Sequence, residues 1–247
     1  MSQKTASSVH LRLSKLHATG NDFLVLLDLE GAWGPRGSEL LDPWTRAALC
    51  DRATGVGADG LIRVLRAGAR GADVAMELSN ADGSWAEMSG NGIRCLAAAP
   101  EVASLLAGDV LRVDTMAGVR TVAVGRDRTG EVTSARVDMG KATFAPSEIP
   151  FTGEDVEKVE ALVGAARYEG GVAGMGNPHL VLFVDDPGLV PIEAHGQALE
   201  RDPRFPARTN VEFVSVEGDE LVMRVWERGI GETRSCGTGA CAAAAVA

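Results

Sequence analysis

The chain has 247 residues, of which 45% are hydrophobic and 23% charged, and its formal net charge at pH 7 is −10. This length and balance are typical of a globular protein with one large domain or two small ones. The negative charge argues against nucleic acid or an anionic membrane as the main partner, because both attract a basic surface.

The cysteines and the N-terminal segment indicate the compartment. Four cysteines are present, and they form no CxxC pair and no cluster with histidine, so their spacing suggests no zinc site. Residues 1–10 lack the apolar core of a signal peptide, and no apolar run is long enough to cross a bilayer. We therefore expect a cytoplasmic protein with reduced thiols and no membrane or nucleic-acid partner.

Two strands joined by a short turn open the predicted fold. Period-2 stretches predict strands at Leu11 to Leu16 and Phe23 to Leu29, with Gly20-Asn21 in the turn between them. Asp42-Pro43 then begins a helix that extends through Cys50, with the aspartate as its N-cap and the proline at its first position. We interpret Cys50 as an inert thiol of the core.

The next segment alternates strands with glycine-rich turns. Gly55, Gly57 and Gly60 precede a strand from Leu61 to Leu65, but neither a phosphate loop nor a dinucleotide-binding GxGxxG is present there. Two further strands flank Asn80-Ala-Asp-Gly, whose Asp-Gly pair is a strong hairpin signal. A structural turn would be enough to explain that motif.

Two stretches of the chain are near-copies of each other. Ser89-Gly-Asn-Gly leads to Cys95 and an alanine-rich segment, and Cys236-Gly-Thr-Gly leads to Cys241 and another. Each copy predicts the start of a helix, where unpaired backbone N–H groups and the helix dipole lower the pKa of a thiol and create an anion site. We therefore predict an activated thiol at Cys236, and we take Cys95 and Cys241 as packing residues.

The second half of the chain supplies the remaining elements. A polar helix is predicted from Glu154 to Ala166, and a short helix from Ile192 to Leu199. Buried strands are predicted after the Asn177-Pro-His179 turn and after Asn210.

The two halves follow one plan. Gly20-Asn21 precedes Ser89 by about as much as Gly176-Asn177 precedes Cys236, so each half has a Gly-Asn turn and then a GxG helix start. We therefore predict a pseudo-duplicated α/β protein, divided into residues 1–137 and 138–247, with its site between the halves.

Facing helix starts of this kind suit proton transfer at a carbon next to a carboxylate. Backbone amides would hold the carboxylate, since glycine lets the main chain approach closely. A thiolate beside it could remove the α-proton, and an acid on the opposite face could return a proton with inverted configuration. This is two-base racemisation or epimerisation, and it needs neither a metal nor a cofactor.

Other polar residues have two interpretations each. Glu227-Arg228 is either a surface ion pair or a holder of the two ends of a zwitterion. Asn80, Asn177 and Asn210 lie in turns, where asparagine is common for conformational reasons, but their amides also suit recognition of amino-acid groups. His179 alone is weak evidence for a site.

The chain resembles the diaminopimelate epimerase family over nearly its whole length. The resemblance rests on seven motifs in the family's order: HATGNDF (17–23), DRATGVGADG (51–60), NADGS (80–84), EMSGNGIRC (87–95), GNPH (176–179), RTNVEF (208–213) and ERGIGETRSCGTGAC (227–241). It implies an α/β fold of two pseudo-symmetric domains, each a curled, mostly antiparallel sheet around a central helix. It also implies a cofactor-independent isomerase that interconverts LL- and meso-2,6-diaminopimelate for lysine and peptidoglycan synthesis, and a homodimer.

The resemblance also assigns roles to residues. Cys236 is implied as one catalytic acid/base. The amide cradle for the reacting carboxylate is implied at Gly90, Asn91, Gly237 and Thr238. The other implied substrate contacts are Asn21, Asn80, Asn177, Asn210, Glu227 and Arg228, with His179 as a residue that lines the site.

The sequence departs from the family at two places. The family's other catalytic cysteine falls on Ser89, whose hydroxyl is a far poorer base than a thiol with a reference pKa of about 8.5. Three explanations are open: an engineered substitution that traps an inactive enzyme, a natural variant with slower or one-sided catalysis, or a relative that binds without turnover. Family members also continue past Ala247 with strands that complete the first domain, so we expect this chain to lack them.

Two alternatives to a diaminopimelate epimerase are therefore kept. One is a proline-racemase-like or dehydratase-like enzyme of the same fold, and the other is an amino-acid-binding relative. The motifs NADGS, RTNVEF and ERG favour diaminopimelate, because a long zwitterion requires a second binding site at its distal end.

Overall fold

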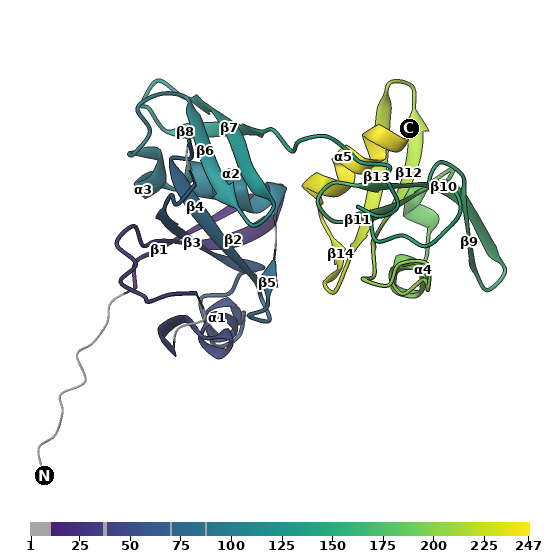
Figure 1. Ribbon diagram of the computed structural model, residues 1–247, viewed down its shortest axis with the longest axis horizontal. Helices are drawn as coiled ribbons and strands as arrows, with labels where there is room; N and C mark the ends of the chain where they lie inside the picture. Colours follow the sequence, from purple (N-terminus) through teal and green to yellow (C-terminus); the bar gives the residue numbers. More distant parts are fainter. Residues whose placement is uncertain (1–10, 37–38, 70, 87) are drawn as a thin grey trace, which may run out of the picture.

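The computed structural model describes residues 11–36, 39–69, 71–86 and 88–247. These residues form two lobes that lie side by side, and a single segment after residue 137 crosses from one to the other (Figure 1). Among the described residues, no helix combines the length and hydropathy needed to span a bilayer.

The first lobe is one curled sheet around a helix. Its strands are β1 (Leu13–Ala18), β2 (Asn21–Leu27), β3 (Gly60–Arg66), β4 (Val74–Asn80), β5 (Trp85–Ala86), β6 (Val110–Thr115), β7 (Gly118–Arg126) and β8 (Val132–Val137). They are ordered β1-β2-β3-β4-β6-β7-β8, with β5 on β4, and only the pairs β2/β3 and β4/β6 are parallel. Helix α2 (Gly90–Ala98) contacts β1, β2, β3, β7 and β8, so the sheet wraps around it.

Burial explains why α2 is central. Ile93, Leu96 and Ala97 of this helix are completely buried against strand residues such as Ile62 and Val113. Burying a large aliphatic side chain contributes about 1.5–3 kcal/mol, so the helix is held by packing rather than by its nine-residue length.

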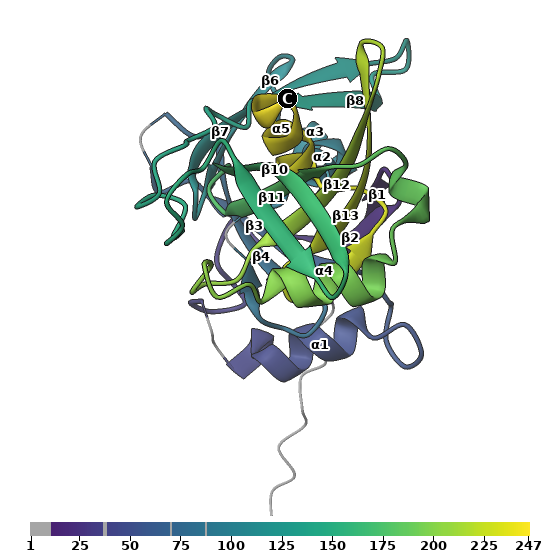
Figure 2. The ribbon, with the colours of Figure 1, turned by 90° about the vertical axis from the view of Figure 1, so that its right-hand side faces the viewer.

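The second lobe is a sheet with helices on both faces. Its strands are β9 (Val159–Val163), β10 (Ala166–Gly174), β11 (Pro178–Phe183), β12 (Asn210–Glu217), β13 (Glu220–Glu227) and β14 (Gly231–Thr233), in the order β14-β13-β12-β11-β10-β9. Only β11 and β12 are parallel. Leu180 and Phe213 pack in the cluster that includes helix α4 (Ile192–Glu200), whereas Val181 and Val214 pack with α5 (Gly237–Val246). Successive strand residues face opposite sides, so the two helices cover opposite faces (Figure 2).

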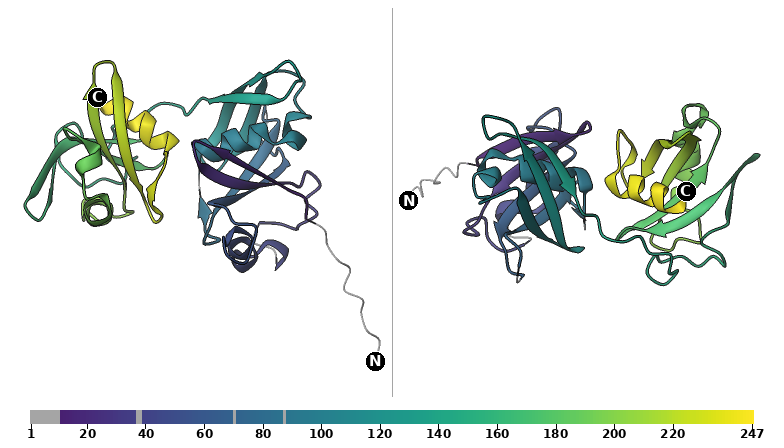
Figure 3. Two further views of the ribbon diagram at one scale, coloured as in Figure 1. Left: turned by 180° about the vertical axis from the view of Figure 1, so that it is seen from behind. Right: turned by 90° about the horizontal axis from the view of Figure 1, so that it is seen from above.

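The lobes share one element order. In the first, β1-β2-α1-β3-β4 leads to α2, and in the second, β10-β11-α4-β12-β13 leads to α5. Figure 3 shows the two lobes from behind and from above. Helices α1 (Pro43–Cys50) and α4 each connect a pair of parallel strands. The predicted fold class, mixed α/β with curled and mostly antiparallel sheets, is therefore confirmed.

Several local predictions agree with the structure. Asp42 caps α1 by accepting a hydrogen bond from the Thr45 backbone N–H at 2.7 Å, and Pro43 occupies its first turn. Cys50 is buried, which raises the pKa of its thiol to about 11. A short helix, α3 (Pro100–Ala103), follows α2. The remaining elements are the 3₁₀ turns Glu39–Leu41 and Pro187–Leu189.

The helix predicted from Glu154 to Ala166 is wrong. This segment contains β9 and a tight turn into β10, in which Gly164 has a φ of 59°. Val159 and Ala161 are buried while Glu160 and Leu162 are exposed, which is the period-2 pattern of a strand. Pairing with β10 decided the conformation of this polar segment.

Candidate active site

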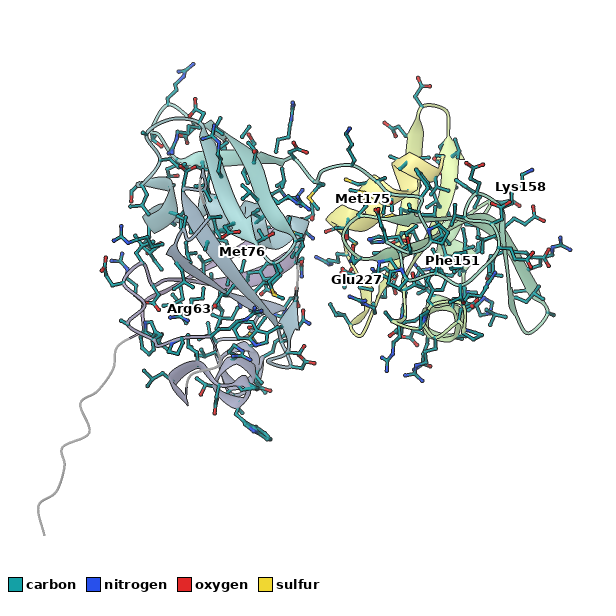
Figure 4. The ribbon with its side chains drawn as sticks, viewed as in Figure 1. Arg63, Met76, Phe151, Lys158, Met175 and Glu227 are labelled. Carbon is teal, nitrogen blue, oxygen red and sulfur yellow. The ribbon has the colours of Figure 1, made fainter. Side chains whose placement is uncertain are left out.

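A cleft of about 750 Å³ lies between the lobes, and residues of both line it. Its volume is in the range of small-molecule sites, so an amino acid fits. The predicted site residues that line it are Asn21, Asn80, Ser89, Gly90, Asn91, Asn177, Asn210, Glu227, Arg228, Cys236, Gly237 and Thr238. Figure 4 places Glu227 on the side of the second lobe that faces the first.

The N-termini of α2 and α5 meet in this cleft. A Cβ added to Gly237 would lie 3.3 Å from the Cα of Gly90, and a Cβ added to Gly90 would lie 3.4 Å from the Cα of Gly237. A side chain at either residue would make a tight contact with the other helix, so glycine at both positions favours this close approach. The unpaired N–H groups and dipoles of the two helices therefore converge on one place, which favours an anion.

Ser89 and Cys236 hold equivalent positions at the two helix starts. Ser89 is the N-cap of α2, and its Oγ accepts a hydrogen bond from the Gly92 N–H at 3.0 Å. Cys236 is the N-cap of α5, and its Sγ accepts one from the Gly239 N–H at 3.3 Å. The duplicated sequence thus produces a duplicated geometry, with an oxygen in one copy and a sulfur in the other.

The thiol of Cys236 is less acidic than the helix start alone predicts. Its side chain is buried, and burial raises its pKa well above the ordinary value. The negative charges of Glu227 and Glu212 raise it further, and hydrogen bonds from Thr238 and Gly239 do not offset these effects. The predicted lowering of the pKa is therefore wrong, and the raised pKa favours the neutral thiol, which can donate a proton.

Glu227 is a half-buried carboxyl group at the end of β13. Burial raises its pKa, and it accepts a hydrogen bond from the Thr233 hydroxyl. The backbone N–H of the next residue, Arg228, donates to Asn210 Oδ1 at 2.9 Å. Glu200, a buried residue of α4, accepts a hydrogen bond from the Gly229 N–H at 3.0 Å and so holds the turn that follows Glu227.

The asparagines of the cleft have their amides oriented by neighbours. Asn21 donates to Asp59 at 2.7 Å, Asn80 donates to Ser84 at 3.1 Å, and Asn210 donates to the Pro178 carbonyl at 2.9 Å. The side chains therefore present defined hydrogen-bonding atoms to the cleft, as recognition of a polar ligand requires.

His179 does not line the cleft. It is completely buried behind Asn177, with its Nε2 2.8 Å from Asn177 Oδ1 and its Nδ1 2.7 Å from Glu212 Oε1. Sequence reasoning missed Glu212, which is also completely buried. A charged residue in the middle of the apolar run VEFV was the available signal, because a strand seldom buries an acid without a partner.

A charged cluster beside Asn21 was also missed. Arg52 donates to Asp22 at 2.6 Å and to Asp59 at 2.7 Å, and Lys15 lies 3.3 Å from Asp22. Burial alone would raise the pKa of Asp22, but Arg52 and Lys15 outweigh it and lower the pKa to about 2. The cluster secures the start of β2, where Asn21 lies.

Comparison with protein families and curated proteins gives a consistent result. The model of the family described as diaminopimelate epimerase matches residues 13–145 and 171–247. A diaminopimelate epimerase of Halothermothrix orenii is 40% identical over 242 residues, which are 95% of this chain and 82% of that protein. Another, of Synechococcus elongatus, is 44% identical over 237 residues, or 94% of this chain and 81% of that one.

Solved structures share the fold at lower identity. A probable proline racemase from Agrobacterium radiobacter aligns with a TM-score of 0.69 at 19% identity, covering 96% of this chain and 76% of that one. A hydroxyproline epimerase from Agrobacterium vitis aligns with a TM-score of 0.67 at 21% identity, covering 95% and 75%. At these identities the likeness concerns the fold alone.

Proposed function

This chain belongs to the diaminopimelate epimerase family, and we propose that it interconverts LL- and meso-2,6-diaminopimelate by moving the proton of one α-carbon. The observation that supports this most is the meeting of two capped helix N-termini at Gly90 and Gly237 inside a cleft lined by both lobes. The product would serve lysine and peptidoglycan synthesis.

The reacting carboxylate lies between the two helix starts in this proposal. The backbone N–H groups at Gly90, Asn91, Gly237 and Thr238 bind it, and the converging dipoles stabilise the negative charge that develops when the α-proton leaves. Because these donors are fixed before the substrate arrives, little reorganisation is needed in the transition state.

Cys236 transfers a proton on one face of the α-carbon. Its raised pKa favours the thiol, which can protonate the carbanion. For the reverse direction it must become a thiolate. The α-ammonium of the substrate brings a positive charge next to it, which favours ionisation.

Ser89 faces the opposite side and limits catalysis. Its hydroxyl is a weak base, and its oxygen accepts a hydrogen bond from the Gly92 N–H. We therefore propose that proton transfer at Ser89 is the slow step. The other substrate contacts, including those to the distal amino and carboxylate groups, are assigned to Asn21, Asn80, Asn177, Asn210, Glu227 and Arg228.

Exchange in D₂O tests this function. The protein is incubated with LL- and meso-diaminopimelate, and α-deuterium and configuration are followed by NMR and chiral chromatography. Exchange with inversion supports epimerisation through both groups, whereas exchange with retention assigns the chemistry to Cys236 alone. Binding without exchange would refute the catalytic proposal and favour an amino-acid-binding relative.

A proline-racemase-like activity is tested in the same experiment with proline. The fold is shared with proline racemase, but the relatives that are 40% and 44% identical are named diaminopimelate epimerases. We expect exchange with diaminopimelate and none with proline. A cytoplasmic location, which the four free cysteines support, and a homodimer complete the proposal.

A further inference from the structure

A buried chain of three side chains connects the core of the second lobe to the cleft. It runs from Glu212 through His179 to Asn177, with contacts of 2.7 and 2.8 Å. Glu212 and His179 are completely buried, whereas Asn177 lines the cleft. The chain therefore connects a core carboxylate to a side chain that can touch a ligand.

Both ring nitrogens of His179 face oxygen atoms. A neutral imidazole has one N–H and could satisfy only one of them, whereas a ring protonated on both nitrogens satisfies Glu212 Oε1 and Asn177 Oδ1 together. The carboxylate of Glu212 supplies the balancing charge, as a buried cation requires. With its Oδ1 held by His179, Asn177 turns its Nδ2 away, and this group has no partner in the part of the chain that the structure describes.

Burying the Glu212 carboxylate is unfavourable for folding. Its Oε2 is buried and has no hydrogen-bond partner among the described residues. A Cβ on Gly239 would lie 2.5 Å from its Oε1, so the carboxylate fits under the first turn of α5 only because residue 239 is glycine. Because this buried carboxylate lowers the stability of the fold, a role in the cleft explains its presence better than a structural role does.

We propose that Glu212 is a positioning residue that acts through the protonated ring of His179 and keeps the N–H donors of Asn177 directed into the cleft, where they select a carboxylate of the substrate. This rests on the proposed function, since it takes the ligand to be an amino acid. With the opposite amide orientation, Asn177 would present Oδ1, which repels a carboxylate and accepts from an ammonium group. Glu212 thus decides which end of a zwitterion this part of the cleft accepts.

Glu212→Gln tests the proposal with little change of shape. Without the carboxylate the ring becomes neutral and donates to the new amide through Nδ1, so Nε2 becomes an acceptor and the Asn177 amide turns over. We expect the KM for diaminopimelate to rise about 10- to 100-fold, the loss of one hydrogen bond to a charged group. We expect kcat to change less than about threefold, because the lost contact is made in the ground state as well. Glu217→Gln, an exposed acid on the same strand, is the matched control and should leave KM unchanged.

Two further measurements exclude a merely structural or catalytic effect. In an Asn177→Ala background, Glu212→Gln should raise KM by less than about twofold more, because its path to the substrate is already removed. Independent effects that multiply in the double variant would overturn the proposal. The ¹⁵N spectrum of histidine-labelled wild-type protein should show His179 protonated on both nitrogens, and the Glu212→Gln spectrum should show it neutral.

The ring spectrum does not depend on turnover, so it separates this proposal from the proposed function. A doubly protonated ring in a protein that binds no diaminopimelate would support the Glu212–His179–Asn177 arrangement and contradict the function. A neutral His179 ring in the wild-type protein would overturn the arrangement even if the enzyme is active. If Glu212→Gln fails to fold, the wild-type spectrum alone still tests the proposal.

Discussion

Ser89→Cys is the substitution with the largest expected gain. The two helix starts show that a sulfur fits, because Cys236 Sγ takes the N–H of Gly239 at 3.3 Å where Ser89 Oγ takes that of Gly92 at 3.0 Å. A Cβ on Gly92 would be 3.2 Å from the Cβ of Ser89, so the glycine leaves room for the longer C–S bond. The new thiol would ionise more readily than a hydroxyl by several pKa units.

The size of the gain follows from the role of a positioned acid–base group. Such groups contribute about 10²- to 10⁴-fold to rate, so we expect kcat to rise at least about 100-fold while KM changes little. The assay is the rate of α-deuterium incorporation from D₂O, with Ser89→Ala as the control that removes the hydroxyl. A folded Ser89→Cys protein with the wild-type rate would refute the assignment of Ser89 as the limiting group.

Three other changes probe the cleft and its support. Gly237→Ala should lower kcat at least about tenfold by pushing the two helix starts apart. Little thermal stability should be lost, because alanine favours helices. Gly108→Ala is the control, because a Cβ there meets nothing within 4 Å, and an equal effect of both substitutions on kcat would contradict the close-approach argument. Because burial raises the pKa of Cys236, its alkylation by iodoacetamide should be slower than that of a free thiol at about pH 7. The alkylation rate should still increase above about pH 9. A rate that reaches its plateau at or below about pH 8.5 would show an activated thiol instead. The pKa of Asp22, about 2, lies below its unfolded value of about 3.9, so its stabilisation is complete above that value and is lost as pH falls through about 2. Urea unfolding should therefore place Asp22→Asn about 1 kcal/mol below wild type at neutral pH, with a gap that narrows on acidification; a constant gap would exclude the ion pairs as its cause.

The sequence determined the features that depend on neighbouring residues. Asp42-Pro43 specified a capped helix start because the N-cap bond closes over three residues, and the GxG motifs specified the starts of α2 and α5 for the same reason. Repetition of a Gly-Asn turn and a GxG start within one chain was enough to predict two related halves with a site between them.

Only the tertiary structure decided what depends on residues far apart in the chain. The segment from 154 to 166 is predicted as a polar surface helix, but residues 159–163 within it form a strand because they pair with β10. The close approach of Gly90 to Gly237 could not be predicted either, because only the packing of the two lobes brings the residues together. The pKa of Cys236 is the clearest case. Its own helix start lowers the pKa of a thiol, but burial and the carboxylates of Glu227 and Glu212, contributed by two other strands, raise it by more, because the energy of a charge depends on everything that surrounds it.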